Sequence, residues 1–86
     1  MISDKLIAQF VKERDEAILS LDLDTFREFY KKWASKGVYD PYFMPPDEIL
    51  EISLYKMVLA IKSAPPDKRE IAKRWLLDRG YDLKIG

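Results

Sequence analysis

The chain has 86 residues, of which 48% are apolar and none is Cys or His. This composition provides for one small folded domain and excludes disulfides, thiolate metal sites and catalysis by Cys or His. Fifteen basic residues balance fifteen acidic ones, so the chain lacks the positive charge of a protein that coats nucleic-acid phosphates. We expect a single domain over residues 1–86.

The first two predicted helices are marked by N-capping residues. Ser3 is a favourable N-cap for a helix that ends near Ser20, and Asp22 opens a second helix that Gly37 stops in the left-handed conformation. The apolar positions of both helices recur at steps of three and four residues. They are Leu6, Ile7, Phe10, Val11, Ala17, Ile18 and Leu21 in the first helix, and Phe26, Phe29, Tyr30 and Trp33 in the second.

Two further helices are predicted to begin at Pro-Pro-Asp sequences. The third opens at Pro46 and is apolar on nearly every side from Ile49 to Ile61, which is typical of a central helix with neighbours on several faces. The fourth opens with residues 65–67 and is closed by Gly80. Its apolar face consists of Ile71, Ala72, Trp75 and Leu76.

These elements predict an all-α fold, a small four-helix domain with a loop rich in proline and aromatic residues between helices 2 and 3. We expect both helix-ending glycines to form Schellman caps, in which Val38 packs on Trp33 and Tyr81 packs on Leu76. The core should centre on the third helix. Its expected central residues are Leu54, Met57, Val58 and Ile61, ringed by Phe10, Ile18, Phe26, Phe29, Trp33, Ile71 and Trp75.

No group of residues predicts catalysis, a cofactor or a metal site. The three glycines lie apart, which excludes a phosphate-cradling loop. Ser53 and Lys56 have the spacing of a Ser–Lys pair, but a small residue at a helix contact and a surface Lys explain them. Carboxylates gather at the expected helix N-termini, where unpaired backbone N–H groups attract them. We therefore expect no enzyme activity.

The chain shows no targeting or membrane-spanning pattern. Its longest apolar stretch, residues 49–61, is interrupted by polar residues and is far shorter than the roughly 20 residues that a membrane span needs. The first residues lack the layout of a signal peptide. We expect a cytoplasmic protein without membrane contact.

Cations on the fourth helix provide one candidate for function. They could form a basic ridge on the side away from Trp75, with aromatic rings nearby for stacking on bases. Acidic residues interrupt the run, and Glu70 precedes a cation by four residues, as in an ion pair that stabilises a helix. We keep weak nucleic-acid binding as the alternative function. The residues concerned are Lys68, Arg69, Lys73 and Arg74.

The loop 39–46 is the main candidate for partner binding. Either Phe43 and Met44 tuck under the loop as a lid on the core, or the loop is an exposed binding patch. In the second case we expect Tyr39 and Tyr42 to be exposed and close together, with Phe43 and Met44 anchoring the loop beneath them. The prolines at 41, 45 and 46 would restrict the loop and lower the entropy lost on binding.

Arg14 interrupts the apolar stripe of the first helix and has two interpretations. Its acidic neighbours can hold its head at the edge of the core while the stem packs inside. Alternatively, it pairs with a carboxylate from another helix and fixes the packing register.

Two segments resemble a family of small proteins of unknown function from phage-like and conjugative elements of gut Firmicutes. They are ERDEAILSLD at residues 13–22 and WLLDRGY at residues 75–81. The resemblance implies a following short helix, a central helix and an accessory role in a mobile element, and it implies no catalytic residue.

The sequence thus predicts a non-enzymatic cytoplasmic domain that acts through protein–protein contact, with a homodimer as one form. The weak nucleic-acid-binding accessory protein described above is the alternative.

Overall fold

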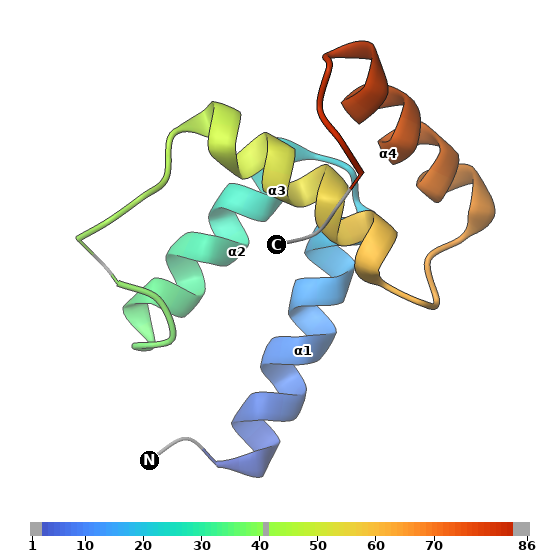
Figure 1. The fold of residues 1–86 in the computed structure, drawn as a ribbon. Coiled ribbons are helices and arrows are strands. Elements are labelled where there is room, and N and C mark those ends of the chain that lie inside the picture. Colours follow the sequence, from blue (N-terminus) through green and yellow to red (C-terminus); the bar gives the residue numbers. More distant parts are fainter. Residues whose placement is uncertain (1–2, 41, 84–86) are drawn as a thin grey trace.

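The computed structural model describes residues 3–40 and 42–83 and contains four helices: α1 (Asp4–Leu19), α2 (Leu23–Ser35), α3 (Asp47–Ala60) and α4 (Pro66–Asp78). Helix α3 packs against all three others, and α1 also packs against α2. Figure 1 shows α1 and α2 below α3 and α4 above it. The described residues contain no strand, so the predicted all-α fold is confirmed.

The helix starts have the predicted local chemistry. The Ser3 hydroxyl accepts a hydrogen bond from the Leu6 N–H at 3.2 Å, and the Asp22 carboxylate accepts one from the Thr25 N–H at 3.2 Å. Helices α3 and α4 begin after Pro46 and Pro65 without a side-chain cap. In α4, Pro66 occupies the first turn, where its fixed φ and missing N–H suit a helix start. Carboxylates lie in the first turn of both helices and interact favourably with the helix dipole.

Both glycines end their helices in Schellman caps, as predicted. Gly37 has φ of +86° and Gly80 has φ of +80°. The Val38 N–H donates to the Trp33 carbonyl at 3.0 Å, and the Tyr81 N–H donates to the Leu76 carbonyl at 3.0 Å. These bonds satisfy carbonyls that a helix end leaves without a partner.

Helix α3 ends without a glycine, and a cation from α4 takes over the capping. The Arg69 guanidinium donates to the carbonyls of Leu59 and Ala64, each at 3.2 Å, and to that of Ile61. The Lys68 ammonium donates to the Leu19 carbonyl at the end of α1. These hydrogen bonds connect α4 to the C-terminal ends of α1 and α3.

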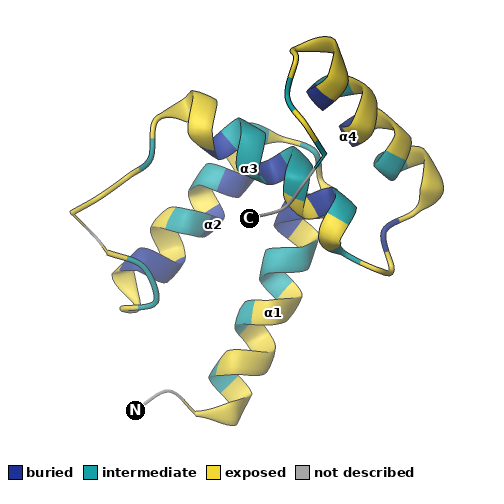
Figure 2. Ribbon diagram, viewed as in Figure 1, coloured by how far each residue is buried: buried dark blue, intermediate teal, exposed yellow. Residues whose placement is uncertain are grey.

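The core lies where α3 crosses α1 and α2 and packs against α4. Trp33, Leu54, Val58 and Leu76 are wholly buried, so the prediction that α3 is central is confirmed. The other buried apolar residues are Ala17, Ile18, Phe26, Phe29, Ala34, Leu50, Ala64 and Ala72. Figure 2 shows the dark-blue positions gathered where the helices meet.

Two expected core residues lie outside it. Met57, predicted to be central, is 37% exposed, and Ile71, predicted to ring the core, is 50% exposed. Ile61 is half-buried, as are Phe10 and Trp75. The reason is that α3 is apolar all round but has neighbours on only part of its circumference, and that α4 turns Ala72 and Leu76 inward. Ile71 then points about 100° away from Ala72 on the helix.

The N-terminal half of α1 projects from the body of the molecule (Figure 1). Ile7 is 48% and Val11 38% exposed, whereas Ala17 and Ile18 on the same predicted stripe are buried. The radius of gyration is 13.4 Å, against about 12 Å for a compact chain of this length. The neighbouring helices therefore cover only the C-terminal part of the apolar stripe of α1.

Candidate protein-interaction surface

The loop between α2 and α3 is anchored by Tyr39. This side chain is half-buried and stacks on Tyr30 of α2, with ring centroids 4.3 Å apart and planes at 9°. It also meets Phe10 and Phe29 edge-on, at 6.0 and 6.3 Å. Burial raises the pKa of the Tyr39 hydroxyl, as expected for a phenol removed from water. The first residue of the loop is therefore part of the core edge.

Asp40 shapes the turn that follows. Its carboxylate accepts a hydrogen bond from the Tyr42 N–H at 2.9 Å, and its carbonyl accepts one from the Phe43 N–H at 3.3 Å. An Asp side chain that bonds the backbone two residues later fixes a turn without regular secondary structure. Pro45 and Pro46 then lead into α3. Both ends of the loop are therefore attached to helices, and its tip has a defined turn.

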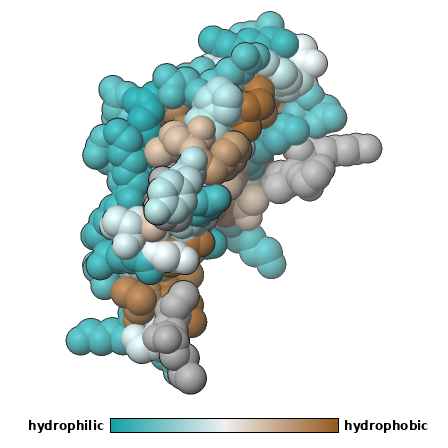
Figure 3. Space-filling view, turned by 90° about the vertical axis from the view of Figure 1, so that its left-hand side faces the viewer, coloured by the Kyte–Doolittle hydropathy of each residue, from teal (hydrophilic) through white to brown (hydrophobic). Residues whose placement is uncertain are grey.

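Three consecutive large side chains at the loop tip are exposed. Tyr42 is 96%, Phe43 58% and Met44 38% exposed. We call these three residues the loop patch. Figure 3 views this side of the molecule and shows hydrophobic and near-neutral colours along its middle, bordered by hydrophilic ones. Single exposed apolar residues are common on proteins, but a contiguous group typically marks an interaction surface.

This arrangement corrects the predicted division of roles within the loop. Tyr42 is exposed as predicted, but Tyr39 is the anchor, and Phe43 and Met44 lie at the surface instead of beneath the tyrosines. The lid interpretation is also wrong for Phe43. The cause is the Schellman cap at Gly37, which directs the chain back along α2 and brings Tyr39 onto Tyr30 before the proline segment begins.

A shallow groove of about 250 Å³ borders the loop patch. Tyr30 and Ala34 of α2 form one side of it, and Phe43 and Met44 form the other. The groove gives the patch a concave edge, against which a partner side chain can pack from two directions. Buried, well-packed anchors at such places contribute most of the energy of an interface.

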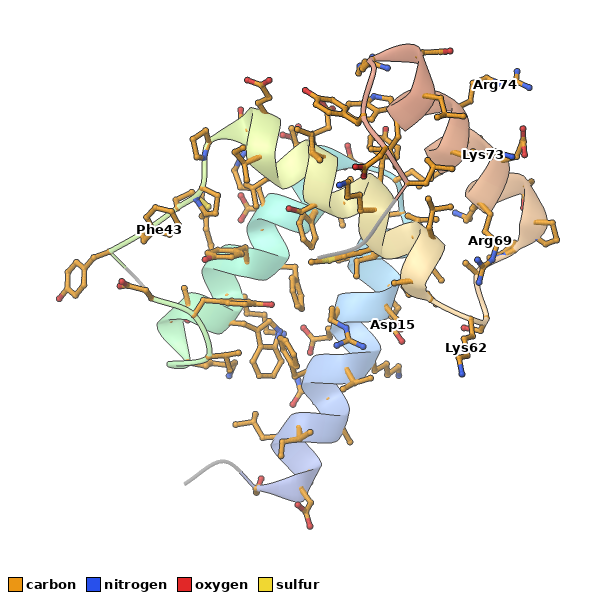
Figure 4. All side chains as sticks on the ribbon, in the orientation of Figure 1. Asp15, Phe43, Lys62, Arg69, Lys73 and Arg74 are labelled. Atoms are coloured by element: carbon orange, nitrogen blue, oxygen red, sulfur yellow. The ribbon has the colours of Figure 1, made fainter. Side chains whose placement is uncertain are left out.

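The four cations of the predicted basic ridge are divided by the structure into two pairs. Lys68 and Arg69 are half-buried and donate to main-chain carbonyls, as described above. Lys73 and Arg74 are exposed, and Arg74 lies 3.8 Å from Glu70. In Figure 4, Lys73 and Arg74 point outward from α4, whereas Arg69 points toward the connection with α3. A ridge of four free cations is therefore not present.

Arg14 pairs with its neighbour Asp15 at 3.2 Å. Its guanidinium also lies 6.0 Å from the centre of the Phe10 ring, and its side chain is 40% exposed. The interpretation that its acidic neighbours hold it at the core edge therefore applies, and the expected alternative of a pair with another helix is wrong.

The residues that the structure describes include no cluster of three or more carboxylates able to hold a metal ion. Among the same residues, no helix is both long enough and apolar enough to span a bilayer.

The fold and the loop patch define a small all-α domain whose most distinctive surface is a turn presenting three apolar side chains. Comparisons with known protein families, with characterised proteins and with solved structures find no match for this chain.

Sequence reasoning missed the capping role of Arg69, although a signal was present. Helix α3 is not followed by a glycine, so its last carbonyls need donors from elsewhere in the chain. It also missed a depression beside Met57 and Lys62, because the apolar pattern of α3 predicts Met57 in the core.

Proposed function

We propose that this chain is a non-enzymatic, cytoplasmic protein-binding domain that contacts its partner through the loop patch. The observation that carries the proposal is the exposure of Tyr42, Phe43 and Met44 on a turn attached at both ends. Each Å² of apolar surface covered on binding contributes about 25 cal/mol, before the costs of association are subtracted. The hydrogen bonds that Asp40 accepts from the Tyr42 and Phe43 N–H groups restrict the patch and keep those costs low.

The partner that fits this surface is a protein with an apolar recess for one or two large side chains, and a second copy of this chain is one such partner. Phe43 is the central residue of the patch and projects beside the groove against α2. Tyr42 can keep its hydroxyl in water at the rim while its ring is covered. An accessory role in a mobile element forms part of the same proposal. It is implied by the family resemblance of residues 13–22 and 75–81.

A photo-crosslinking amino acid at position 43 tests the proposal in the native cells. We expect a defined crosslinked protein from position 43 and none from Leu77, a matched control that is 51% exposed on α4. With the crosslinker at position 44 instead, the parent chain should give the same crosslinked protein, and the double variant Tyr42→Ser, Phe43→Ser should not. Equal products from positions 43 and 77, or none from position 43, would overturn the proposal. Salt-sensitive binding to generic duplex DNA would favour the alternative function instead.

Stability measurements separate binding residues from the anchor of the loop. Tyr42→Ser should change the free energy of unfolding by less than about 0.5 kcal/mol, because its side chain is almost fully exposed. Tyr39→Ser should lower it by about 2 kcal/mol, because the ring stacks on Tyr30 and meets two further rings. Urea unfolding of the two variants provides the comparison, and a loss for Tyr42→Ser as large as that for Tyr39→Ser would show that the loop tip is part of the core.

A further inference from the structure

A depression of about 580 Å³ lies where the C-terminal half of α1 faces the last turn of α3 and the α3–α4 connection. Its volume is in the range of about 300–1,000 Å³ found for ligand-binding clefts. In Figure 4, Asp15 and Lys62 mark this region, and Phe43 of the loop patch lies on the opposite side of the molecule. The depression is therefore a separate surface from the loop patch.

The apolar lining of the depression comes mainly from α3. Met57, Ala60 and Ile61 contribute to it, together with Ile18 of α1. Met57 is 37% exposed here, which is why it is absent from the core. Methionine has a flexible, polarisable side chain that adapts to the shape of what it contacts. This lining suits an apolar group of moderate size.

The rim of the depression carries two cations and one carboxylate. Arg14 engages Asp15 through its Nε and Nη2 atoms, each at 3.2 Å, which leaves Nη1 without a bond in the described part of the chain. Lys62 is exposed and forms no ion pair with any residue that the structure describes. Two cations against one already paired carboxylate leave the rim positive and able to accept one further carboxylate.

The end of α3 does not cancel this positive charge. A helix C-terminus carries a partial negative charge, which would repel an anion. Here the Arg69 guanidinium donates to the carbonyls of Leu59 and Ile61, so a full positive charge lies against the helix end. The depression therefore combines an apolar lining with an electropositive rim.

We propose that the depression binds the C-terminal residue of a partner chain, with its apolar side chain on Met57 and Ile61 and its carboxylate between Arg14 and Lys62. The rim residues Ala60, Lys62 and Ser63 are exposed, so the opening is wide. A small-molecule site normally buries about 70–90% of its ligand, whereas the rim of this depression is formed by exposed residues. A chain end needs only its last residue covered, and charge complementarity supplies the specificity.

Nitrogen-15 heteronuclear NMR titration with short peptides tests this assignment. The probe is acetyl-Ala-Ala-Ala-Leu with a free carboxylate, and its matched control is the same peptide with a C-terminal amide. We expect the free acid to shift the amide signals of residues 14–18 and 57–63, and the amide peptide to bind at least about fivefold more weakly. Lys62→Gln should weaken binding of the free acid by a similar factor, whereas Lys73→Gln, an exposed cation on α4, should not.

Several results would overturn the assignment. They are equal binding of the acid and the amide, no shift at residues 57–63, unchanged binding by Lys62→Gln in a variant whose other signals match the parent, and tighter binding of decanoate than of the peptide. The last result would identify a site for small amphiphilic acids instead of a chain end. Phe43→Ser should leave peptide binding unchanged. The experiments therefore test the peptide site in the depression and the partner surface at the loop patch independently of each other.

Discussion

At the scale of single residues, three backbone positions in the described chain have positive φ. Two are the helix-ending glycines, and the third is Leu21, with φ of +56°, in the tight turn between α1 and α2. Leucine is rarely found there, because its Cβ crowds the backbone. Leu21 is half-buried against the core, and its N–H donates to the Ile18 carbonyl at 3.2 Å. Packing and a hydrogen bond thus offset the local strain.

Replacing either helix-ending glycine tests the cost of this conformation. Gly37→Ala or Gly80→Ala should lower the free energy of unfolding by about 1 kcal/mol. An added Cβ would meet no atom within 4 Å at either site, so the cost comes from the residue's own backbone and not from a neighbour. Urea unfolding measures it, and Gly→Asn should cost less, because Asn tolerates positive φ. An alanine variant as stable as the parent would contradict this account.

Glu13 makes stability depend on pH. Its carboxylate accepts hydrogen bonds from Lys32 at 2.6 Å and Gln9 at 2.8 Å, and these bonds lower its pKa, Lys32 having the larger effect. The buried Trp33 indole N–H lies nearby and lowers the pKa further, although it does not reach hydrogen-bond geometry. A depressed pKa in the folded state means that the unfolded state binds the proton more tightly, so stability falls as the pH falls.

The expected loss begins near pH 4.5, the ordinary pKa of Glu, and continues through the lowered folded-state pKa. Glu13→Gln should therefore reduce the drop in melting temperature between pH 7 and pH 3. Asp22, whose pKa is lowered by the Thr25 hydroxyl and N–H, acts in the same direction and remains in this variant. Identical pH profiles for the parent and Glu13→Gln would contradict the assignment.

At the scale of elements, ion pairs and capping cations connect helices that are distant in sequence. Arg27 of α2 bonds Asp24 of its own helix and Asp47 at the start of α3, each at 2.7 Å. Lys32 of α2 bonds Glu13 of α1 at 2.6 Å. These partly exposed pairs contribute little energy each, but they connect neighbouring helices. Arg69 differs, because its partners are main-chain carbonyls, of which those of Leu59 and Ala64 accept no other hydrogen bond in the described part of the chain.

Removing the Arg69 guanidinium should destabilise the domain through α3. Arg69→Gln should lower the free energy of unfolding by about 2 kcal/mol, because it leaves partly buried carbonyls unpaired. The matched variant Arg74→Gln should change it by less than about 0.5 kcal/mol, because Arg74 is exposed and only loosely paired with Glu70. Thermal and urea unfolding distinguish the two. Equal small effects would show that Arg69 is a surface cation and would restore the basic ridge.

At the scale of the whole molecule, the loop patch and the depression lie on opposite sides of the domain (Figure 4). The loop patch lies before α3 and the depression lies at its end. Because α3 is apolar on nearly every side and the other described helices cover only part of it, part of that surface stays open. The depression lies on this open surface of α3, whereas the loop patch belongs to the connection between α2 and α3.

Leu54 should be among the most sensitive positions. It is wholly buried where α3 meets its neighbours, so Leu54→Ala should cost roughly 2–5 kcal/mol. Leu77→Ala, a leucine that is 51% exposed on α4, is the matched control and should cost far less. Differential scanning calorimetry measures both. A melting temperature for Leu54→Ala within a degree or two of the parent would show that α3 is not the centre of the core.

The sequence by itself determined the four helices, the N-caps at Ser3 and Asp22, the Schellman caps at the two glycines, and Leu54 and Val58 as central core residues. Ser3, Asp22, Gly37 and Gly80 act on partners within five residues, so their effects can be predicted from local order alone. The apolar periodicity of α2 likewise placed Phe26, Phe29 and Trp33 inside. Such local rules hold whatever the rest of the chain does.

Only the tertiary structure decided which apolar residues stay exposed and which cations donate hydrogen bonds to main-chain carbonyls. Tyr39 is an anchor because Tyr30 lies beneath it, and Met57 is open because no helix covers that side of α3. Arg69 and Lys73 are both cations of α4, but only Arg69 reaches carbonyls at the end of α3. This contact depends on the angle at which α4 packs against α3. Periodicity tells which face of a helix is apolar, whereas coverage of that face depends on elements distant in sequence.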